Sequence, residues 1–205
     1  MNGRTTRRGT RPRYRGPAGP TPGGAADETP DADPESVARA IVLRQLTMAP
    51  RSRAQLAQKL ADRGTPADVA DYVLDRMEAV GLVDDEAFAE GWVRSRQATR
   101  GLSRRALAHE LRSKGIDDEL ARATLDQVDD DTEVELARGL VIRRLPSVRG
   151  LPPEKQVNRL VGMLARKGYS SGLAFRVVRE SLVSDGLTGS GEELTDVALD
   201  ERLDR

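Results

Sequence analysis

The sequence predicts an all-α protein: three tandem three-helix, helix–turn–helix-like repeats stacked into an elongated, curved body. Two leucines four positions apart, followed by a glycine, recur along the chain. The three sets are Leu56, Leu60 and Gly64; Leu107, Leu111 and Gly115; and Leu160, Leu164 and Gly168. They are related by shifts of 51 and 53 residues. Recurrence at this period is typical of stacked repeats, because one small unit cannot cover its own apolar face.

The composition of the 205-residue chain favours the same class. Charged residues make up 32%, hydrophobic residues 38% and aromatic residues only 3%, which suits small helical units with aliphatic cores. The chain has no cysteine and one histidine, His109, which excludes disulfides, cysteine-ligated zinc and most triad chemistry. Because no apolar run approaches the ~18 residues that span a bilayer, we expect a cytoplasmic protein without a membrane partner.

Local composition divides the chain into five segments. Residues 1–34 combine Arg, Gly and Pro with few apolar side chains and are predicted to be a disordered tail. We predict repeat one at 35–83, repeat two at 84–131 and repeat three at 132–183. Residues 184–205 carry seven acids against two arginines and are predicted to be an acidic, flexible tail.

The first repeat carries helix start and stop signals in the expected order. Apolar residues from Val37 to Leu46 keep near-helical spacing. Ser52 can cap the second helix, which Gly64 ends. Pro66 is placed at the first position of the third helix, where its missing N–H is harmless. That helix is predicted to continue to Gly81.

The second repeat contains the most informative stretch. Asp84 or its neighbour Asp85 can cap the first helix, and Phe88 and Trp92 lie four apart on one face of it. A glycine ends that helix, and Ser103 can cap the next one. The sequence therefore predicts a packed aromatic anchor on a helix that also carries several arginines.

The third repeat differs from the second in one loop. Its first helix matches at a shift of 49 and its second at 53, so its first loop has four extra residues, around Pro152 and Pro153. The Asp-rich boundary at 126–131 lacks the spacing and glycine of a calcium loop and is interpreted as a solvated helix cap. We find no nucleotide-binding loop and assign no catalytic residue, metal site or cofactor.

Basic side chains are the remaining signal. Residues 88–115 hold seven Lys and Arg against two Glu, and residues 138–167 hold eight against one. If the repeats stack in register, these charges form a stripe that suits a phosphate backbone or an acidic groove on a protein polymer. The alternative is a solubilising face. The candidate binding residues are Arg94, Arg96, Arg100, Arg104, Arg105, Arg112, Lys114, Arg143, Arg144, Arg149, Lys155, Arg166 and Lys167.

Four stretches resemble the RecX family, regulators of the RecA recombinase. They are Gly81-Leu-Val-Asp-Asp-Glu-Ala-Phe-Ala with Trp92 and Arg94–Arg96, Gly101-Leu-Ser-Arg-Arg-Ala-Leu, Glu110-Leu-Arg-Ser-Lys-Gly-Ile116, and Arg166-Lys-Gly-Tyr169. The resemblance covers residues 36–183, and the Arg-rich head is similar to those of actinobacterial members. It implies three three-helix repeats that bind along the groove of the RecA filament on single-stranded DNA. It also implies inhibition of filament growth, ATP hydrolysis and strand exchange, and so a non-enzymatic role in DNA repair, recombination and the SOS response.

The expected partners are the RecA filament and single-stranded DNA, with double-stranded DNA as a further candidate, and we expect a monomer. A second interpretation of the repeats is a helix–turn–helix transcriptional regulator that reads one major groove. A third is an all-helical scaffold that binds only protein.

Overall fold

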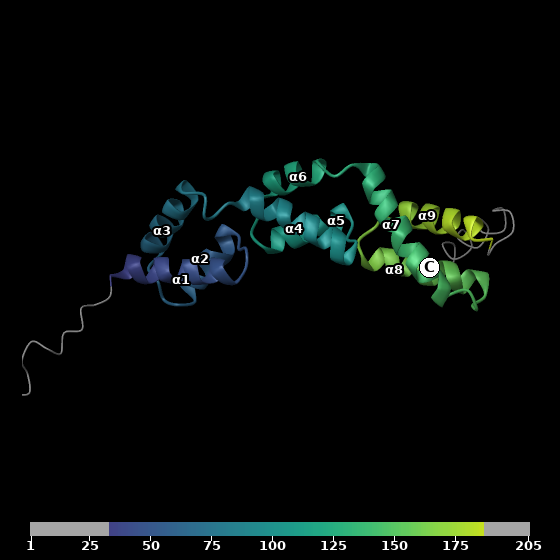
Figure 1. Cartoon of the computed structure of the whole chain (residues 1–205), viewed down its shortest axis with the longest axis horizontal. Coiled ribbons are helices and arrows are strands. Elements are labelled where there is room, and N and C mark those ends of the chain that lie inside the picture. Colours follow the sequence, from purple (N-terminus) through teal and green to yellow (C-terminus); the bar gives the residue numbers. More distant parts are fainter. Residues whose placement is uncertain (1–32, 187–205) are drawn as a thin grey trace, which may run out of the picture.

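The computed structural model describes residues 33–186, whose regular structure is entirely helical (Figure 1). Its helices are α1 (Pro34–Met48), α2 (Arg53–Ala61), α3 (Ala67–Ala79), α4 (Asp85–Arg100), α5 (Arg104–Ser113), α6 (Asp118–Asp126), α7 (Asp130–Arg144), the 3₁₀ turn η1 (Leu145–Ser147), α8 (Pro153–Arg166) and α9 (Ser171–Ser184). Residues 1–32 and 187–205, where most of the two predicted tails fall, lie outside the described residues.

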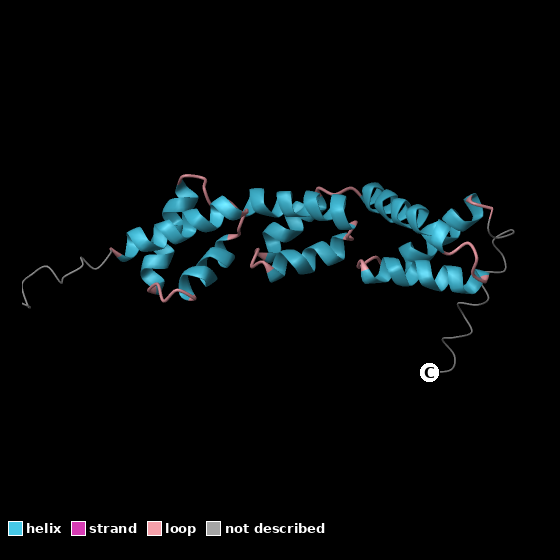
Figure 2. Ribbon diagram, turned by 60° about the horizontal axis from the view of Figure 1, so that its bottom comes forward, coloured by secondary structure: helices cyan, strands magenta, loops and turns pink. Residues whose placement is uncertain are grey.

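The helices form three groups in a row along the longest axis of the molecule (Figures 1 and 2). Helices α1–α3 form unit one, α4–α6 unit two and α7–α9 unit three. The row makes a shallow arch in the view of Figure 1. The prediction of an elongated body of three three-helix repeats is therefore confirmed.

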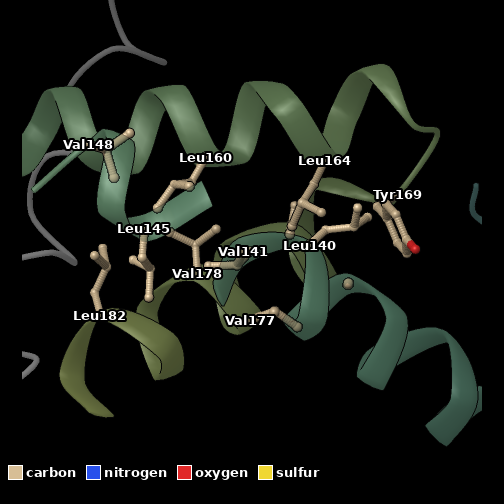
Figure 3. Close-up of a cluster of buried hydrophobic side chains, with 12 residues drawn as sticks. Leu140, Val141, Leu145, Val148, Leu160, Leu164, Tyr169, Val177, Val178 and Leu182 are labelled. Atoms are coloured by element: carbon tan, nitrogen blue, oxygen red, sulfur yellow. The ribbon is translucent and has the colours of Figure 1, made fainter. Parts of the chain in front are cut away.

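Each unit has its own hydrophobic core. The six leucines of the repeated pattern are all at most 1% exposed. In unit three, Leu160 and Leu164 point from α8 towards α7 and α9, where they meet Val141 and Val178 (Figure 3). Full burial of one such side chain contributes about 1.5–3 kcal/mol. The units are thus held together internally by separate apolar clusters.

Most of the predicted helix boundaries are confirmed. The Asp84 carboxylate accepts from the N–H of Ala87 over 2.8 Å at the start of α4. The hydroxyls of Ser52 and Ser103 accept from the third N–H of α2 and of α5. The prediction for Pro66 is wrong by one residue: it is the N-cap of α3, with extended backbone, and the first helical residue follows it.

Helix α1 buries a narrower face than its apolar run suggests. Ala38 and Val42 are fully buried and Leu46 is half-buried. Val37 and Leu43 belong to the same run, but they are 43% and 42% exposed. Unit one offers α1 only two partner helices, so part of the run stays in solvent.

The two joints between units share one construction. The hydroxyl of Ser52 donates to the carbonyl oxygen of Lys114 over 2.5 Å, and the N–H of Ser103 donates to the carbonyl oxygen of Lys167 over 3.0 Å. Each lysine precedes a glycine with positive φ, and a Cβ on Gly168 would lie 2.5 Å from the Ser103 hydroxyl. The start of the second helix of one unit therefore packs directly on the glycine turn of the next.

Candidate anion-binding surface

A cleft of about 630 Å³ lies where units two and three meet. Its cationic lining comes from the end of α4 (Arg100), from α5 (Arg105), and from the end of α8 and the turn after it (Arg166 and Lys167). We call the surface that these four residues line the interunit basic cleft. Arg100 and Arg166 lie in the last turn of their helices, where the helix dipole favours positive charge.

Two neighbouring residues of α5, His109 and Glu110, also line the interunit basic cleft. His109 is exposed there. Glu110 is the one acid that lines this cleft. Three arginines and one lysine therefore face a single carboxylate, which leaves the cleft with a net positive charge.

Lys167 reports the crowding of positive charge in this region. Its ammonium group donates to the carbonyl oxygen of Arg100. Partial burial lowers the pKa of Lys167, and the charges of Arg100 and Arg143 lower it further. The charge of Arg143 therefore acts on the cleft from α7, and an anion bound there would relieve the mutual repulsion.

Three of the arginines are available to a ligand. Arg105, Arg143 and Arg166 are exposed, and none of them forms an ion pair with another residue of the range 33–186. Arginine presents a planar fork of N–H donors that matches phosphate or carboxylate oxygens. These side chains can thus bind an anion without breaking an internal contact.

Trp92 organises a second group of predicted residues behind the cleft. Its ring stacks on Phe88 with the centroids 5.8 Å apart, as expected from their spacing. The guanidinium of Arg96 lies 3.9 Å from the Trp92 ring centroid, and the ammonium of Lys114 lies 4.9 Å from it. Trp92 Nε1 and Arg96 Nε both donate to Glu110 Oε2, over 2.8 and 3.0 Å. Arg96 and Lys114 therefore help to fix α4 against α5.

Arg94 lies on another face of α4. It pairs with Glu90 over 3.2 Å and lines a separate groove with Thr124 and Val128 of the α6 side. Since the interunit basic cleft is lined by the far end of α4 and by α5, Arg94 does not share a surface with Arg100. The continuous basic stripe expected from the sequence is interrupted here.

Arg104 is a structural residue of the joint. Its backbone N–H donates to Glu133 Oε1 over 2.9 Å, and its guanidinium bonds to Glu133, Asp130 and the carbonyl oxygen of Val128. The sequence places a cation in the first turn of α5, where the dipole disfavours it; the carboxylates from the start of α7 offset that cost.

The remaining candidates lie apart from the cleft. Arg112 pairs with Asp118 over 3.0 Å, and Arg149 forms a bidentate pair with the two carboxylate oxygens of Asp185. Lys155 is exposed and lies about 16 Å along α8 from Arg166, at 1.5 Å per residue. Arg144 is also exposed, in the last turn of α7.

Two residues that shape the cleft were not among the candidates predicted from the sequence. Glu110 is acidic and Tyr169 is uncharged, so neither belongs to the pattern of basic residues in the sequence. The Tyr169 hydroxyl donates to the carbonyl oxygen of Gly101 over 3.1 Å. Glu110 lies four residues before Lys114, and Tyr169 directly follows Gly168. Their position within the recurring motif stretches is the signal in the sequence that points to them.

Neither a metal centre nor a membrane span is found in the part of the chain that the structure describes. Residues 33–186 contain no cluster of three or more His, Cys, Asp or Glu side chains that could hold a metal ion. No helix in that range is both long and apolar enough to cross a bilayer.

The fold and the cleft define a class: an all-helical tandem-repeat protein with a cationic surface where two repeats meet. Sequence models of the first, second and third three-helix domains of RecX match residues 38–77, 84–125 and 131–178. The chain belongs to the RecX family.

Curated relatives agree with this assignment, and a solved structure shares the fold. "Regulatory protein RecX" of Thermobifida fusca is 54% identical over 169 residues, which cover 82% of this chain and 89% of that protein. The Streptomyces coelicolor protein of the same name is 53% identical over 157 residues, covering 77% and 84%. The crystal structure of RecX from Lactobacillus salivarius matches with a TM-score of 0.67 at 23% identity, over 74% of this chain and 99% of that one. The expected actinobacterial type is confirmed by the first two relatives.

Proposed function

We propose that this protein is a non-enzymatic, cytoplasmic regulator that binds the RecA filament on single-stranded DNA. It inhibits filament growth, ATP hydrolysis and strand exchange, and thereby modulates DNA repair and the SOS response. Membership of a family of regulatory proteins supports the general role. The observation that supports binding to such a polymer is the interunit basic cleft, which lies between units two and three of an elongated body.

The shape of the molecule suggests how it inhibits. A row of three units can lie along a helical groove and contact several filament subunits at once (Figure 2). Such a position obstructs the addition of RecA monomers and the approach of a second DNA strand. Contacts from several units to one polymer raise the overall affinity without requiring any single strong contact.

In this proposal, units two and three make the main contact. Arg105, Arg143 and Arg166 are exposed and unpaired within 33–186, whereas Arg53 of unit one is held by Asp75 and Glu78 of α3. Arg44, Arg63 and Arg76 of unit one are exposed as well, but no residue of unit one lines the interunit basic cleft. Unit one lengthens the surface that lies along the filament, while units two and three supply the electrostatic attraction.

The test is the ATPase activity of RecA on single-stranded DNA, together with filament length, as this protein is titrated at several salt concentrations. We expect both to fall with added protein, and the effect to weaken as salt rises, because exposed charges are screened. Unchanged ATPase activity and filament length at saturating protein would rule the function out. A saturable footprint on a defined duplex without any effect on RecA would favour the transcriptional regulator, and salt-independent inhibition would favour a protein-only scaffold.

A further inference from the structure

Glu110 is the one carboxylate in a cleft that is otherwise cationic, and all three of its side-chain hydrogen bonds come from residues of α4. We propose that Glu110 is a built-in competitor for phosphate: it positions Arg96 and Arg100 and sets the affinity of the interunit basic cleft for a nucleic-acid backbone. The proposal deepens the proposed function and rests on it for the assumption that the cleft meets DNA.

The contacts of Glu110 resemble those of a bound phosphate oxygen pair. Oε2 accepts from Trp92 Nε1 over 2.8 Å and from Arg96 Nε over 3.0 Å, and Oε1 accepts from Arg100 Nη1 over 3.2 Å. The Glu110 side chain is 23% exposed and that of Arg100 is 58% exposed. The Arg100 guanidinium can therefore leave the carboxylate and pair with an incoming anion, while the more buried contacts stay in place.

The lining of the cleft favours a phosphate backbone over an acidic protein surface. Protein interfaces usually centre on exposed apolar or aromatic anchors. The largest apolar side chain in this lining, Leu102, is only half-exposed, whereas the cations Arg105 and Arg166 are exposed. Arginine forks bind phosphate oxygens in pairs, and counterions released from nucleic acid add to the affinity.

Loss of the Glu110 charge should strengthen binding. Glu110→Gln keeps the size of the side chain and one acceptor for Trp92 Nε1, but it removes the negative charge and frees Arg100. We expect the affinity for single-stranded DNA to rise about three- to fivefold, the range for one partly exposed charge contact. If Arg100 gains one phosphate contact, the slope of log K against log salt becomes steeper by about 0.7.

Two variants separate this role from bulk charge and from folding. Glu110→Asp keeps the carboxylate, so its salt slope should match that of the unmodified protein. Glu90→Gln removes the same charge from α4, but Glu90 pairs with Arg94 outside the cleft. We expect Glu90→Gln to change the DNA affinity by less than about twofold.

The experiment measures the fluorescence anisotropy of a labelled single-stranded oligonucleotide with the full chain of each variant, over a series of salt concentrations. Helical content and thermal unfolding establish that each variant is folded. A folded Glu110→Gln protein that binds DNA no more tightly than the unmodified protein overturns the proposal. So does an equal gain in Glu90→Gln, or tighter binding of poly-glutamate than of DNA.

A measurement on the unmodified protein covers the case in which Glu110→Gln does not fold. Trp92 is the only tryptophan of the chain and donates to Glu110, so its emission reports the state of this carboxylate. Inorganic polyphosphate, which has no bases to quench it, should shift that emission on binding, and saturation without a shift contradicts the proposal. If Glu110→Gln gains DNA affinity but no variant affects RecA, the proposed function fails while the role of Glu110 stands.

Discussion

The Tyr169 hydroxyl donates to the carbonyl oxygen of Gly101 over 3.1 Å and so joins unit three to the end of α4. Gly101 stands in the left-handed conformation that ends this helix, with φ 58°. The preceding carbonyl, of Arg100, accepts from the Lys167 ammonium. Carbonyls at the end of α4, which lack partners within the helix, are therefore satisfied from the next unit.

Removal of the Tyr169 hydroxyl should weaken this joint. Tyr169→Phe leaves the buried ring in place, and we expect the free energy of unfolding to fall by about 0.5–1.5 kcal/mol, the usual net worth of one hydrogen bond. Urea denaturation measures the change. Tyr72→Phe is the control: Tyr72 is 45% exposed and bonds only to Arg76 of its own helix, so a loss as large as that of Tyr169→Phe contradicts the account.

Stability should also depend on pH through Tyr169. Burial, with a further contribution from Glu133, raises its pKa from 10.0 to about 12. The folded state thus holds the proton more tightly than the unfolded state, and this stabilisation is complete below pH 10 and is lost as the pH rises towards 12. The pKa of Lys167 is lowered instead, so the unfolded state holds this proton more tightly than the folded state. Its contribution therefore makes the protein more stable as the pH rises, up to the ordinary lysine pKa of 10.5. Unfolding curves of Tyr169→Phe and of the unmodified protein between pH 9 and 12 isolate the contribution of the tyrosine. The substitution should make the decline of the unfolding free energy above pH 10 shallower. Equal declines in the two proteins would contradict this role of Tyr169.

The glycine turns differ in what surrounds them, and this predicts unequal costs of substitution. Gly64 and Gly168 both have positive φ, so alanine at either costs about 1–2 kcal/mol of backbone strain. A Cβ at Gly64 would meet no atom within 4 Å, whereas at Gly168 it would lie 2.7 Å from the Ala106 Cβ. Overpacking adds about 1–3 kcal/mol. Gly168→Ala should therefore be the more destabilising substitution in urea or thermal unfolding, and equal costs would mean that the joint is not tightly packed.

Neighbouring arginines of α5 should have separable roles. Arg104→Ala leaves Glu133 short of its cationic partner and should cost about 1–3 kcal/mol of stability. Arg105→Ala removes an exposed side chain and should change stability by less than about 0.5 kcal/mol while weakening DNA binding. Thermal unfolding and oligonucleotide binding of the two variants check this division. The reverse pattern would show that Arg105, not Arg104, supports the joint.

The repeat architecture was accessible from the sequence because it rests on local signals. Leu107 and Leu111 are fully buried, and Gly115 has positive φ, as their recurrence requires. Serine and aspartate caps act within three residues of their own position, so Ser103 could be assigned from the residues beside it. The extra residues of the third repeat also fall as expected, in the stretch that forms η1 and the start of α8.

The arginine partners could not be derived in the same way. Whether Arg104 is free or tied depends on Glu133, which is 29 residues away and belongs to the next unit. Spacing along one helix separates the face of Arg94 from that of Arg100, but it does not reveal which face meets α5 and which meets α6. Charge counting therefore found the region of the cleft and overstated the number of cations in it.

The most direct test of the central claim is a charge reversal at two arginines of the interunit basic cleft and at Arg143, whose charge acts on it; we call this triple substitution the cleft variant. Arg105→Glu, Arg143→Glu and Arg166→Glu, made together, change exposed residues that form no ion pair within 33–186. The matched control reverses Arg44, Arg176 and Arg179, which are exposed on α1 and α9. We predict that the cleft variant, with unchanged helical content and Tm, no longer inhibits the RecA ATPase on single-stranded DNA, while the control variant still does. The claim that the cleft binds the filament would be contradicted if the cleft variant inhibited as strongly as the unmodified protein. It would also be contradicted if the cleft variant and the control variant lost inhibition equally.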